Sequence, residues 1–476
     1  MGGNGQNPPV PAAEKNFDLF VIGTGPAGQR AAVQAAKLGK SVGICERREV
    51  VGGVCINTGT IPSKTFREAV LYLTGFQMRG LYGASYAVKE RITMEDLLYR
   101  CEHVIKKEVD VIRDQMRRNG IVLIGGAARF LDPYTLEVAG SGGVVRVRAD
   151  KVLIATGTTV ARPQGVPIDG QSILTSDDIL GLKEVPRTLT VVGAGVVGAE
   201  YASIFAALRV EVTLVDKRPR LLEFVDTEIV ESLTYQMRNM DCTFRLHEEV
   251  ASVRLEGPRR AVTVLKSGKL IVSDVILYSV GRVGATADLN LEAAGLAADE
   301  RGRLKVNEVF QTSRPHIYAA GDVIGFPALA STSMEQGRLA ACHAFGIACR
   351  SLPHLFPYGI YSVPEISMVG QNEEELTAAR VPYEVGVSRY REIARGAILG
   401  DDSGLLKILF HRDTRRILGV HIIGTNATEL VHIGQAVLAH DGTIDYFVNA
   451  VFNYPTFAEC YKVAALDGYN KVGPPR

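Results

Sequence analysis

The sequence is poor in the features that mark metal sites, nucleic-acid partners and membrane anchors. Its seven cysteines show neither CxxC spacing nor a nearby histidine cluster, which argues against a structural zinc site. With 53 basic and 52 acidic side chains the net charge is +1, so no overall field attracts the chain to nucleic acid or to an anionic membrane. No apolar run is long enough to cross a bilayer. We therefore expect no metal, no nucleic-acid partner and no membrane contact.

The N-terminus also lacks the basic start and the apolar run of a secretion signal. We expect residues 1–15 to form a disordered tail, and we expect a cytoplasmic protein whose cysteines are all reduced thiols. At 476 residues the chain has room for roughly three domains of about 150 residues each. Because 46% of the residues are hydrophobic, these domains can bury a large core.

An internal repeat organises the first half of the chain. Each copy is an apolar strand, a GxGxxG turn and a helix, and an acidic residue ends the next strand 18 residues after the third glycine. The glycines are Gly23, Gly25 and Gly28 in one copy and Gly193, Gly195 and Gly198 in the other, and the acids are Glu46 and Asp216. Such glycines let the backbone approach a pyrophosphate at a helix N-terminus, and the acid suits a ribose hydroxyl. One copy could serve a plain turn, but two complete copies predict two dinucleotide-binding folds.

The last part of the chain has a different pattern of apolar and polar residues. Two strand-like runs, Leu405 to Phe410 and Arg416 to Ile422, are joined by a polar turn, which predicts a hairpin. Helical spacing follows at Leu430, Ile433 and Val437, and we interpret it as a core-facing stripe. A hairpin-containing α+β domain is therefore expected at the end of the chain.

Four further segments complete the pattern. They are Gly53 to Lys64 (GVCINTGTIPSK), Ala155-Thr156-Gly157, Gly321-Asp322 and Pro455 to Glu459. Together with the repeat they resemble the pyridine nucleotide–disulfide oxidoreductases across nearly the whole chain. The resemblance implies an α/β fold with two Rossmann-like domains, for FAD and NAD(P), and a C-terminal α+β dimerisation domain that forms a homodimer. A larger homo-oligomer built from such dimers stays open. The implied bounds are 16–160 with 281–350 for FAD, 161–280 for NAD(P) and 351–476 for the interface.

Two departures from that family concern its thiol chemistry. Cys55 occupies the first place of the expected cysteine pair, but Thr60 occupies the second, and a threonine cannot close a disulfide. Where thiol-reducing members carry a histidine before a proline, this chain has Tyr454. Phenols in general titrate near pH 10, so a tyrosine is a poor substitute for an imidazole. With both losses, the chain resembles the soluble, flavin-dependent pyridine nucleotide transhydrogenases.

This resemblance implies that hydride passes from NADPH through FAD to NAD at one nucleotide site, with ping-pong kinetics. It places Lys64 beside the flavin, paired with Glu200, as an electrostatic tuner of catalysis. Two alternatives stay open: an NAD(P)H diaphorase, oxidase or quinone reductase, and a protein that holds FAD without turnover. Cys55 could also act as a lone peroxidatic thiol, and Tyr454 and Glu459 could border the flavin of a partner subunit or simply pack in an interface.

A single nucleotide site must accept both a ribose 2′-hydroxyl and a 2′-phosphate. Asp216 suits the hydroxyl, whereas Arg218, with Lys217 or Arg220, suits the phosphate through charge-assisted hydrogen bonds. The alternative is a solvated basic turn. The complete set of expected cofactor contacts is Gly23, Gly25, Gly28, Glu46, Gly53, Cys55, Lys64, Thr156, Gly157, Gly193, Gly195, Gly198, Asp216, Lys217, Arg218, Gly281, Gly321 and Asp322.

Overall fold

The computed structural model describes residues 13–257, 259–349 and 355–473. The chain forms two compact units. The first comprises Met1–Pro62, Glu102–Ala161 and Gly281–Ser351, and the second comprises Ser63–Cys101, Arg162–Val280 and Leu352–Arg476. The predicted α/β class is confirmed, whereas the three-domain bounds stay a prediction.

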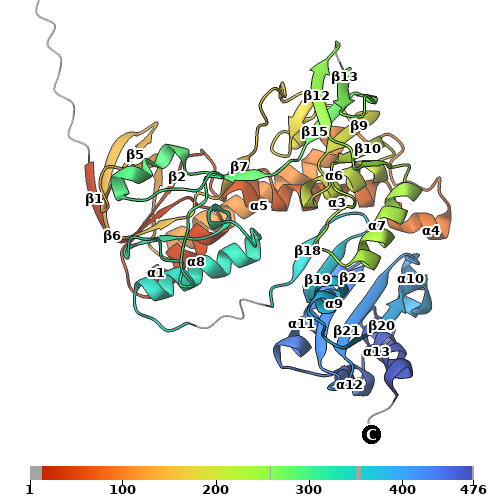
Figure 1. Ribbon diagram of the computed structural model, residues 1–476. Coiled ribbons are helices and arrows are strands. Elements are labelled where there is room, and N and C mark those ends of the chain that lie inside the picture. The colour runs from red at the N-terminus through yellow and green to blue at the C-terminus, as the bar shows by residue number, and fades with distance from the viewer. Residues whose placement is uncertain (1–12, 258, 350–354, 474–476) are drawn as a thin grey trace, which may run out of the picture. The chain divides into compact units, whose positions relative to one another are not determined.

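A seven-stranded sheet forms the centre of the first unit, in the order β3-β2-β1-β6-β5-β4, with β17 beside β6. Its parallel part holds β3, β2, β1, β6 and β17, and β5 and β4 continue it antiparallel. Helices α1 and α8 lie side by side (Figure 1). The bounds are β1 Ala13–Ile22, α1 Pro26–Lys37, β2 Val42–Glu46, α2 Gly53–Asn57, β3 Val122–Gly125, β4 Ala127–Phe130, β5 Thr135–Gly140, β6 Gly143–Ile154, β17 Ile317–Ala319 and α8 Ala330–Ala344, with the small pair β7 Thr158–Val160 and β16 Arg282–Gly284.

The second unit contains the other copy of the repeat. Its parallel sheet has the order β11-β10-β9-β15-β8, and a three-stranded antiparallel sheet, β12-β13-β14, belongs to the same unit. The bounds are β8 Ile173–Thr175, β9 Thr188–Val192, α6 Val196–Ala207, β10 Glu211–Asp216, α7 Thr227–Asn239, β11 Thr243–Leu246, β12 Val250–Leu255, β13 Ala261–Leu265, β14 Leu270–Ser273 and β15 Val275–Tyr278. Strand β9 is almost entirely buried, which matches its run of β-branched and leucine residues.

The end of the chain folds into an antiparallel sheet of the order β18-β19-β22-β21-β20, within the second unit. The predicted hairpin is confirmed as β21 and β22, and the predicted helical stripe lies in α11. The bounds are β18 Tyr358–Ile360, β19 Ile366–Gly370, α9 Glu373–Ala378, β20 Tyr383–Arg389, α10 Ala394–Leu399, β21 Leu405–His411, β22 Ile417–Ile423, α11 Ala427–Ala439, α12 Ile444–Asn449 and α13 Glu459–Val472.

Helices α3 (Thr60–Leu73), α4 (Arg79–Tyr82) and α5 (Met94–Arg118) complete the chain, and the boundary between the units falls within α3 and α5. One hydrophobic core runs through the second unit from α3 to the C-terminal sheet. Phe66 of α3 packs against Phe205 of α6 with ring centroids 5.8 Å apart, and Ile366 and Ile423 of the C-terminal sheet belong to the same buried cluster. The nucleotide fold and the C-terminal sheet are therefore built on a shared core.

Two expectations need correction. Strand β1 begins at Ala13 and pairs with β6, so residues 13–15 of the expected tail are part of the sheet, while residues 1–12 lie outside the described residues. The expectation that all cysteines are reduced is wrong for Cys342 and Cys349, which form a disulfide. Their Cα atoms lie 6.3 Å apart, within the range that a disulfide bridges.

Arg209 stands in the second copy of the repeat where the first has Gly39. Both residues adopt the left-handed conformation, with φ of 65° for Arg209 and 75° for Gly39, so the turn between helix and strand is preserved. Along the described parts of the chain, no helix is both long and apolar enough to cross a membrane.

Gly337 sets how closely α8 approaches α1, because a Cβ at this position would lie 2.1 Å from the carbonyl oxygen of Ala27. We expect Gly337→Ala to lower the free energy of unfolding by about 1–3 kcal/mol, as overpacking does elsewhere. Urea denaturation measures this change. Gly125→Ala is the matched control, because nothing lies within 4 Å of its added Cβ. Equal stability of the two variants would contradict the close helix contact.

Candidate cofactor and nucleotide sites

The first unit contains a cavity at the carboxyl ends of its parallel strands, the usual place for a ligand in such sheets. Nine of the predicted contacts line it: Gly23, Gly25, Glu46, Gly53, Cys55, Thr156, Gly157, Gly321 and Asp322. Other lining residues were not predicted, among them Thr24, Arg47, Gly126, Asp288 and Ser333. Gly28 and Gly281 belong to the same unit but do not line the cavity.

Gly28 is a packing residue that does not line the cavity. A Cβ at Gly28 would lie 2.0 Å from the carbonyl oxygen of Gly23, so only glycine lets α1 start so close to the end of β1. Gly25 is the N-cap of α1, and a Cβ there would meet nothing within 4 Å. The start of α1 is therefore open to the cavity and can hold an anion with its N–H groups.

Glu46 ends β2 and ties the glycine loop together. Its carboxylate accepts hydrogen bonds from the Thr24 hydroxyl and from the backbone N–H of Arg48, the latter over 3.0 Å. Thr24 Oγ1 in turn accepts the N–H of Gly52 over 2.9 Å. Thr24 thus joins the acid to the start of the Gly53 segment, a role that the x position of a GxG pattern does not reveal.

The cavity fits a dinucleotide cofactor such as FAD. Thr156 lines the cavity, and its buried Oγ1 has no hydrogen-bond partner among the described residues, so the hydroxyl group can bond to a polar ligand there. Burial raises the pKa of Asp322, opposed by the charge of Arg282 and a hydrogen bond from Ser333. Cys55 and Thr60 line the same cavity, so the place of the second thiol holds a hydroxyl group.

The second motif has the same geometry in the second unit. A Cβ at Gly198 would lie 1.8 Å from the carbonyl oxygen of Gly193, and one at Gly193 would lie 2.5 Å from that of Ser279. Gly195 is the N-cap of α6. The end of β9 and the start of α6 therefore have the geometry of a turn that can hold an anion.

Asp216 ends β10, and Arg218 saturates its carboxylate. Oδ1 accepts the Nε–H and backbone N–H of Arg218, and Oδ2 accepts an Nη–H of Arg218 over 2.7 Å and the N–H of Ala194 over 2.5 Å. Burial alone would raise the pKa of Asp216, but these hydrogen bonds and the arginine charge outweigh it and lower the pKa. A ribose hydroxyl can bind this carboxylate only if Arg218 releases one of its hydrogen bonds to Asp216.

The other two basic residues of this turn differ in their surroundings. Arg220 donates to the Glu223 carbonyl over 2.7 Å and to Thr227, and it forms a salt bridge with Glu374. Lys217 is exposed and makes no salt bridge with any residue that the structure describes. Arg218 and Lys217, rather than Arg220, are therefore the cations available to a 2′-phosphate.

The structure brings Lys64 and Glu200 together within the second unit. Lys64 Nζ donates to both carboxylate oxygens of Glu200, over 2.9 and 2.7 Å. Glu200 is buried in α6, and its side chain is only 5% exposed. A buried carboxylate requires a partner, and Lys64 of α3 is that partner. The pair therefore holds the lysine side chain against α6, the helix that begins at the second glycine motif.

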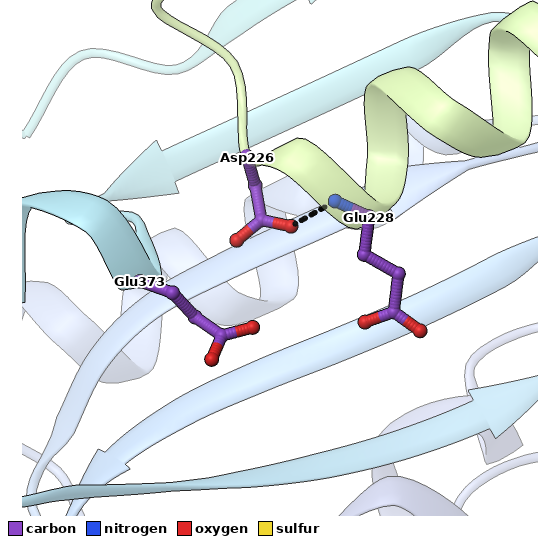
Figure 2. A group of neighbouring side chains, drawn as sticks. All are labelled: Asp226, Glu228 and Glu373. Carbon is purple, nitrogen blue, oxygen red and sulfur yellow. Dashed lines mark hydrogen bonds between the residues drawn. The ribbon is translucent and has the colours of Figure 1, made fainter.

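A third group of charged residues was not predicted. Asp226 and Glu228 at the start of α7 and Glu373 at the start of α9 bring their carboxylates within 4.8 Å of one another (Figure 2). The buried ammonium of Lys407 on β21 contacts all three, 2.9 Å from Asp226 and 3.2 Å from Glu228. Burial lowers the pKa of Lys407, but the carboxylates outweigh it and raise the pKa. The Lys407 ammonium therefore compensates the negative charge of these carboxylates.

Tyr454 and Glu459 lie near the start of α13. Tyr454 is 74% exposed, and Glu459 Oε2 is buried without a hydrogen-bond partner in the described part of the chain. These observations leave both predicted alternatives for the pair, a neighbouring subunit's site or plain interface packing, as predictions.

Comparison with known proteins gives a consistent family. Residues 17–337 match the pyridine nucleotide-disulphide oxidoreductase model, and residues 356–465 match the dimerisation domain of the same group. Proteins named soluble pyridine nucleotide transhydrogenase are similar over nearly their full length: 57% identity in Mycobacterium bovis (96% of this chain, 98% of the relative) and 45% in Colwellia psychrerythraea (96% and 100%).

Solved structures share the fold. LpdA from Mycobacterium tuberculosis has a TM-score of 0.87 at 25% identity, covering 96% of this chain and 99% of its own. The HOCl-induced flavoprotein disulfide reductase RclA from Escherichia coli has a TM-score of 0.86 at 25% identity, covering 94% and 99%.

Removal of the Lys407 charge leaves the Asp226 and Glu373 carboxylates uncompensated. We expect Lys407→Met to lower the free energy of unfolding by about 3–5 kcal/mol, the usual effect of breaking a buried ion pair. Lys183→Met, at an exposed position, controls for the loss of a lysine and should change it by about 0.5 kcal/mol or less. Chemical denaturation measures both. Unchanged stability of Lys407→Met would mean that the carboxylates find other compensation.

Proposed function

The chain belongs to the pyridine nucleotide-disulphide oxidoreductase family, and we propose that it acts as a flavin-dependent transhydrogenase that passes hydride between NADPH and NAD. One observation carries the proposal: Thr60 lines the cofactor cavity together with Cys55, where thiol chemistry would require a second cysteine. Electrons on the flavin must then leave by a route other than a protein disulfide, and the second glycine motif offers the nicotinamide nucleotides as carriers. The name shared by the relatives favours this activity over a diaphorase, an oxidase, a quinone reductase or a non-catalytic protein.

The residues of the first cavity would hold FAD, which accepts hydride from one nicotinamide and returns it to another. The start of α1, opened by Gly25, suits the pyrophosphate, and Glu46 lies where a ribose is bound in such folds. The lining glycines of the Gly53 and Gly321 segments let a ligand approach the backbone. This cavity therefore offers what a dinucleotide requires at each end.

The turn at the start of α6 would bind the nicotinamide nucleotides in succession. Gly195 opens the helix N-terminus for their pyrophosphate. Arg218 and Lys217 suit the 2′-phosphate of NADP(H), and Asp216 suits the 2′-hydroxyl of NAD(H) when the Arg218 guanidinium withdraws. The ion pair between Asp216 and Arg218 thus gives one site two modes of recognition.

Lys64 and Glu200 would act through charge. The ammonium of Lys64 is held by Glu200 and would stabilise negative charge that develops at the flavin when hydride arrives. Hydride transfer requires no protein proton donor, so electrostatic stabilisation is the role that this pair can fill. The dimerisation-domain match supports a homodimer, and the relatives' description as soluble supports a cytoplasmic location.

The central test is direct transfer between nucleotides. The pure holoenzyme is mixed without oxygen with NADPH and a thio-analogue of NAD, and reduction of the analogue is followed by absorbance. We expect turnover with ping-pong kinetics, because both nucleotides use one site. Bleaching of the flavin by NADPH without onward transfer would refute the proposal, and rapid reduction of a disulfide substrate would do the same.

Nucleotide choice tests the second site. We expect Arg218→Ala to weaken NADPH binding by about tenfold or more, because a charge-assisted hydrogen bond is worth about 1.5–3 kcal/mol. NADH binding should change much less, since the variant also frees the Asp216 carboxylate. Arg254→Ala, a half-exposed arginine of β12, is the control. Equal losses for NADPH and NADH would show that Arg218 does not read the phosphate.

A further inference from the structure

The two glycine motifs have matching backbones, and each is flanked by one residue that differs between them. Ala155 in the first unit and Ser279 in the second directly follow the strand that pairs with the motif strand, β6 or β15. The N–H of each donates to the carbonyl at the end of the motif strand, over 2.9 and 2.8 Å. A Cβ at the first glycine of either motif would lie 2.5 Å from the carbonyl oxygen of this residue. Ala155 and Ser279 therefore occupy equivalent places, one with a methyl group and the other with a hydroxyl group.

The Ser279 hydroxyl binds the second glycine turn. Its Oγ donates to the Val192 carbonyl over 2.9 Å and to the Gly193 carbonyl over 3.1 Å, so one proton is shared between two acceptors. A Cβ at Gly198 would lie 2.8 Å from the same Oγ, so the hydroxyl group fills the space beside the third glycine. The side chain of Ser279 therefore packs into the turn that it holds.

The peptide group between Gly193 and Ala194 is bound at both ends. Its carbonyl oxygen accepts from Ser279, and its N–H donates to Asp216 Oδ2 over 2.5 Å. Because a peptide group is planar, a hydrogen bond that fixes the carbonyl also fixes the direction of the N–H. Ser279 is thus connected through one rigid group to the acid that suits a ribose hydroxyl.

The first motif supports its acid with a hydroxyl group in another place. Thr24 occupies the position of Ala194, and its N–H, over 3.3 Å, and its hydroxyl both donate to Glu46 Oε2. Ala155 has no side-chain donor to offer the first turn. The first copy therefore has its hydroxyl group on the turn itself, whereas the second copy has it at the end of the neighbouring strand.

This difference leaves the second acid open to exchange. Asp216 Oδ2 accepts from the Arg218 guanidinium in addition to the Ala194 N–H, where Glu46 has the fixed hydroxyl of Thr24. When the guanidinium turns away, the N–H groups of Ala194 and Arg218 are the backbone donors that still hold the carboxylate. The direction in which Asp216 then faces a ribose hydroxyl depends on the peptide group that Ser279 holds.

We propose that Ser279 is a positioning residue for Asp216 and favours NAD(H) over NADP(H) at the second motif. The inference rests on the proposed function for the identity of the two ligands. A 2′-hydroxyl requires the carboxylate, whose direction is set through Ala194, whereas a 2′-phosphate requires the cations Lys217 and Arg218. Loss of the serine hydroxyl therefore weakens the first mode of recognition more than the second.

The test is the affinity of the oxidised holoenzyme for NAD and for NADP, measured by isothermal titration calorimetry. No hydride moves under this condition, because both the flavin and the nucleotides are oxidised. We expect Ser279→Ala to weaken NAD binding about fivefold, the order of one neutral hydrogen bond, and NADP binding about twofold or less. Alanine is the residue of the first copy at this place, so the turn should keep its fold.

Ser367→Ala is the matched control. Its hydroxyl also donates to a backbone carbonyl, that of Tyr358 over 3.2 Å, but in the C-terminal sheet. We expect this variant to leave both affinities unchanged, because the lost hydrogen bond does not reach Asp216. A selective loss of NAD binding in Ser367→Ala would show that the effect does not come from the glycine turn, and it would overturn the proposal.

The double variant Ser279→Ala/Asp216→Ala separates positioning from a general weakening of the turn. We expect it to bind NAD as Asp216→Ala alone does, because a hydroxyl group that acts through the carboxylate has nothing left to orient. Equal losses of NAD and NADP in Ser279→Ala, unchanged NAD binding in that variant, or a further loss of NAD in the double variant would each overturn the proposal. If Ser279→Ala does not fold, Ser279→Cys, whose S–H is a weaker donor, gives the same comparison.

The outcome can be told apart from that of the transfer assay. A selective loss of NAD binding in Ser279→Ala, with no reduction of the NAD analogue by the unaltered protein, would refute the transhydrogenase function and leave the role of Ser279 standing. Transfer activity with equal effects of Ser279→Ala on both nucleotides would refute the positioning role alone. Binding of neither nucleotide by the unaltered holoenzyme would refute both.

Discussion

Both nucleotide folds depend on one steric constraint, the contact between the third glycine of each motif and the carbonyl of the first. Neither Gly28 nor Gly198 could carry a Cβ without striking that carbonyl, at 2.0 and 1.8 Å respectively. The constraint lets each helix start directly behind the end of its strand. In front of each helix, the acid that ends the neighbouring strand accepts the backbone N–H of the residue after the first glycine, Glu46 from Thr24 and Asp216 from Ala194, which fixes the turn.

The features that the sequence predicted are those with a local signature. The glycines, the acid 18 residues later and the strand runs around them follow from spacing alone, and nine of the expected contacts line one cavity. The hairpin of β21 and β22 was equally accessible, because two apolar runs joined by a polar turn have few other solutions. The pairing of Lys64 with Glu200 came from the family resemblance, since no local pattern connects residues 136 positions apart.

The features that the sequence did not predict either join segments far apart in the chain or distinguish residues of the same type. Tyr361 and Lys407 contact residues of α6, α3, α7 and α9 that lie far away in the sequence. Arg218 and Arg220 look alike in a basic turn, yet one is engaged by Asp216 and the other by Thr227 and Glu374. The GxG pattern puts no requirement on Thr24, although its hydroxyl links Glu46 to Gly52. The Cys342–Cys349 disulfide was not predicted because its cysteines lack CxxC spacing.

The continuous core of the second unit couples the unfolding of its parts. Phe66, Phe205, Ile366 and Ile423 share one buried cluster, so excision of the C-terminal segment would leave a large apolar face of the nucleotide fold in water. The segments that match two different family models, residues 17–337 and 356–465, therefore contribute to one buried core in the second unit. Heating this unit should therefore give a single cooperative transition, with equal calorimetric and van't Hoff enthalpies, because the segment that matches the dimerisation domain also packs against the core of the nucleotide fold.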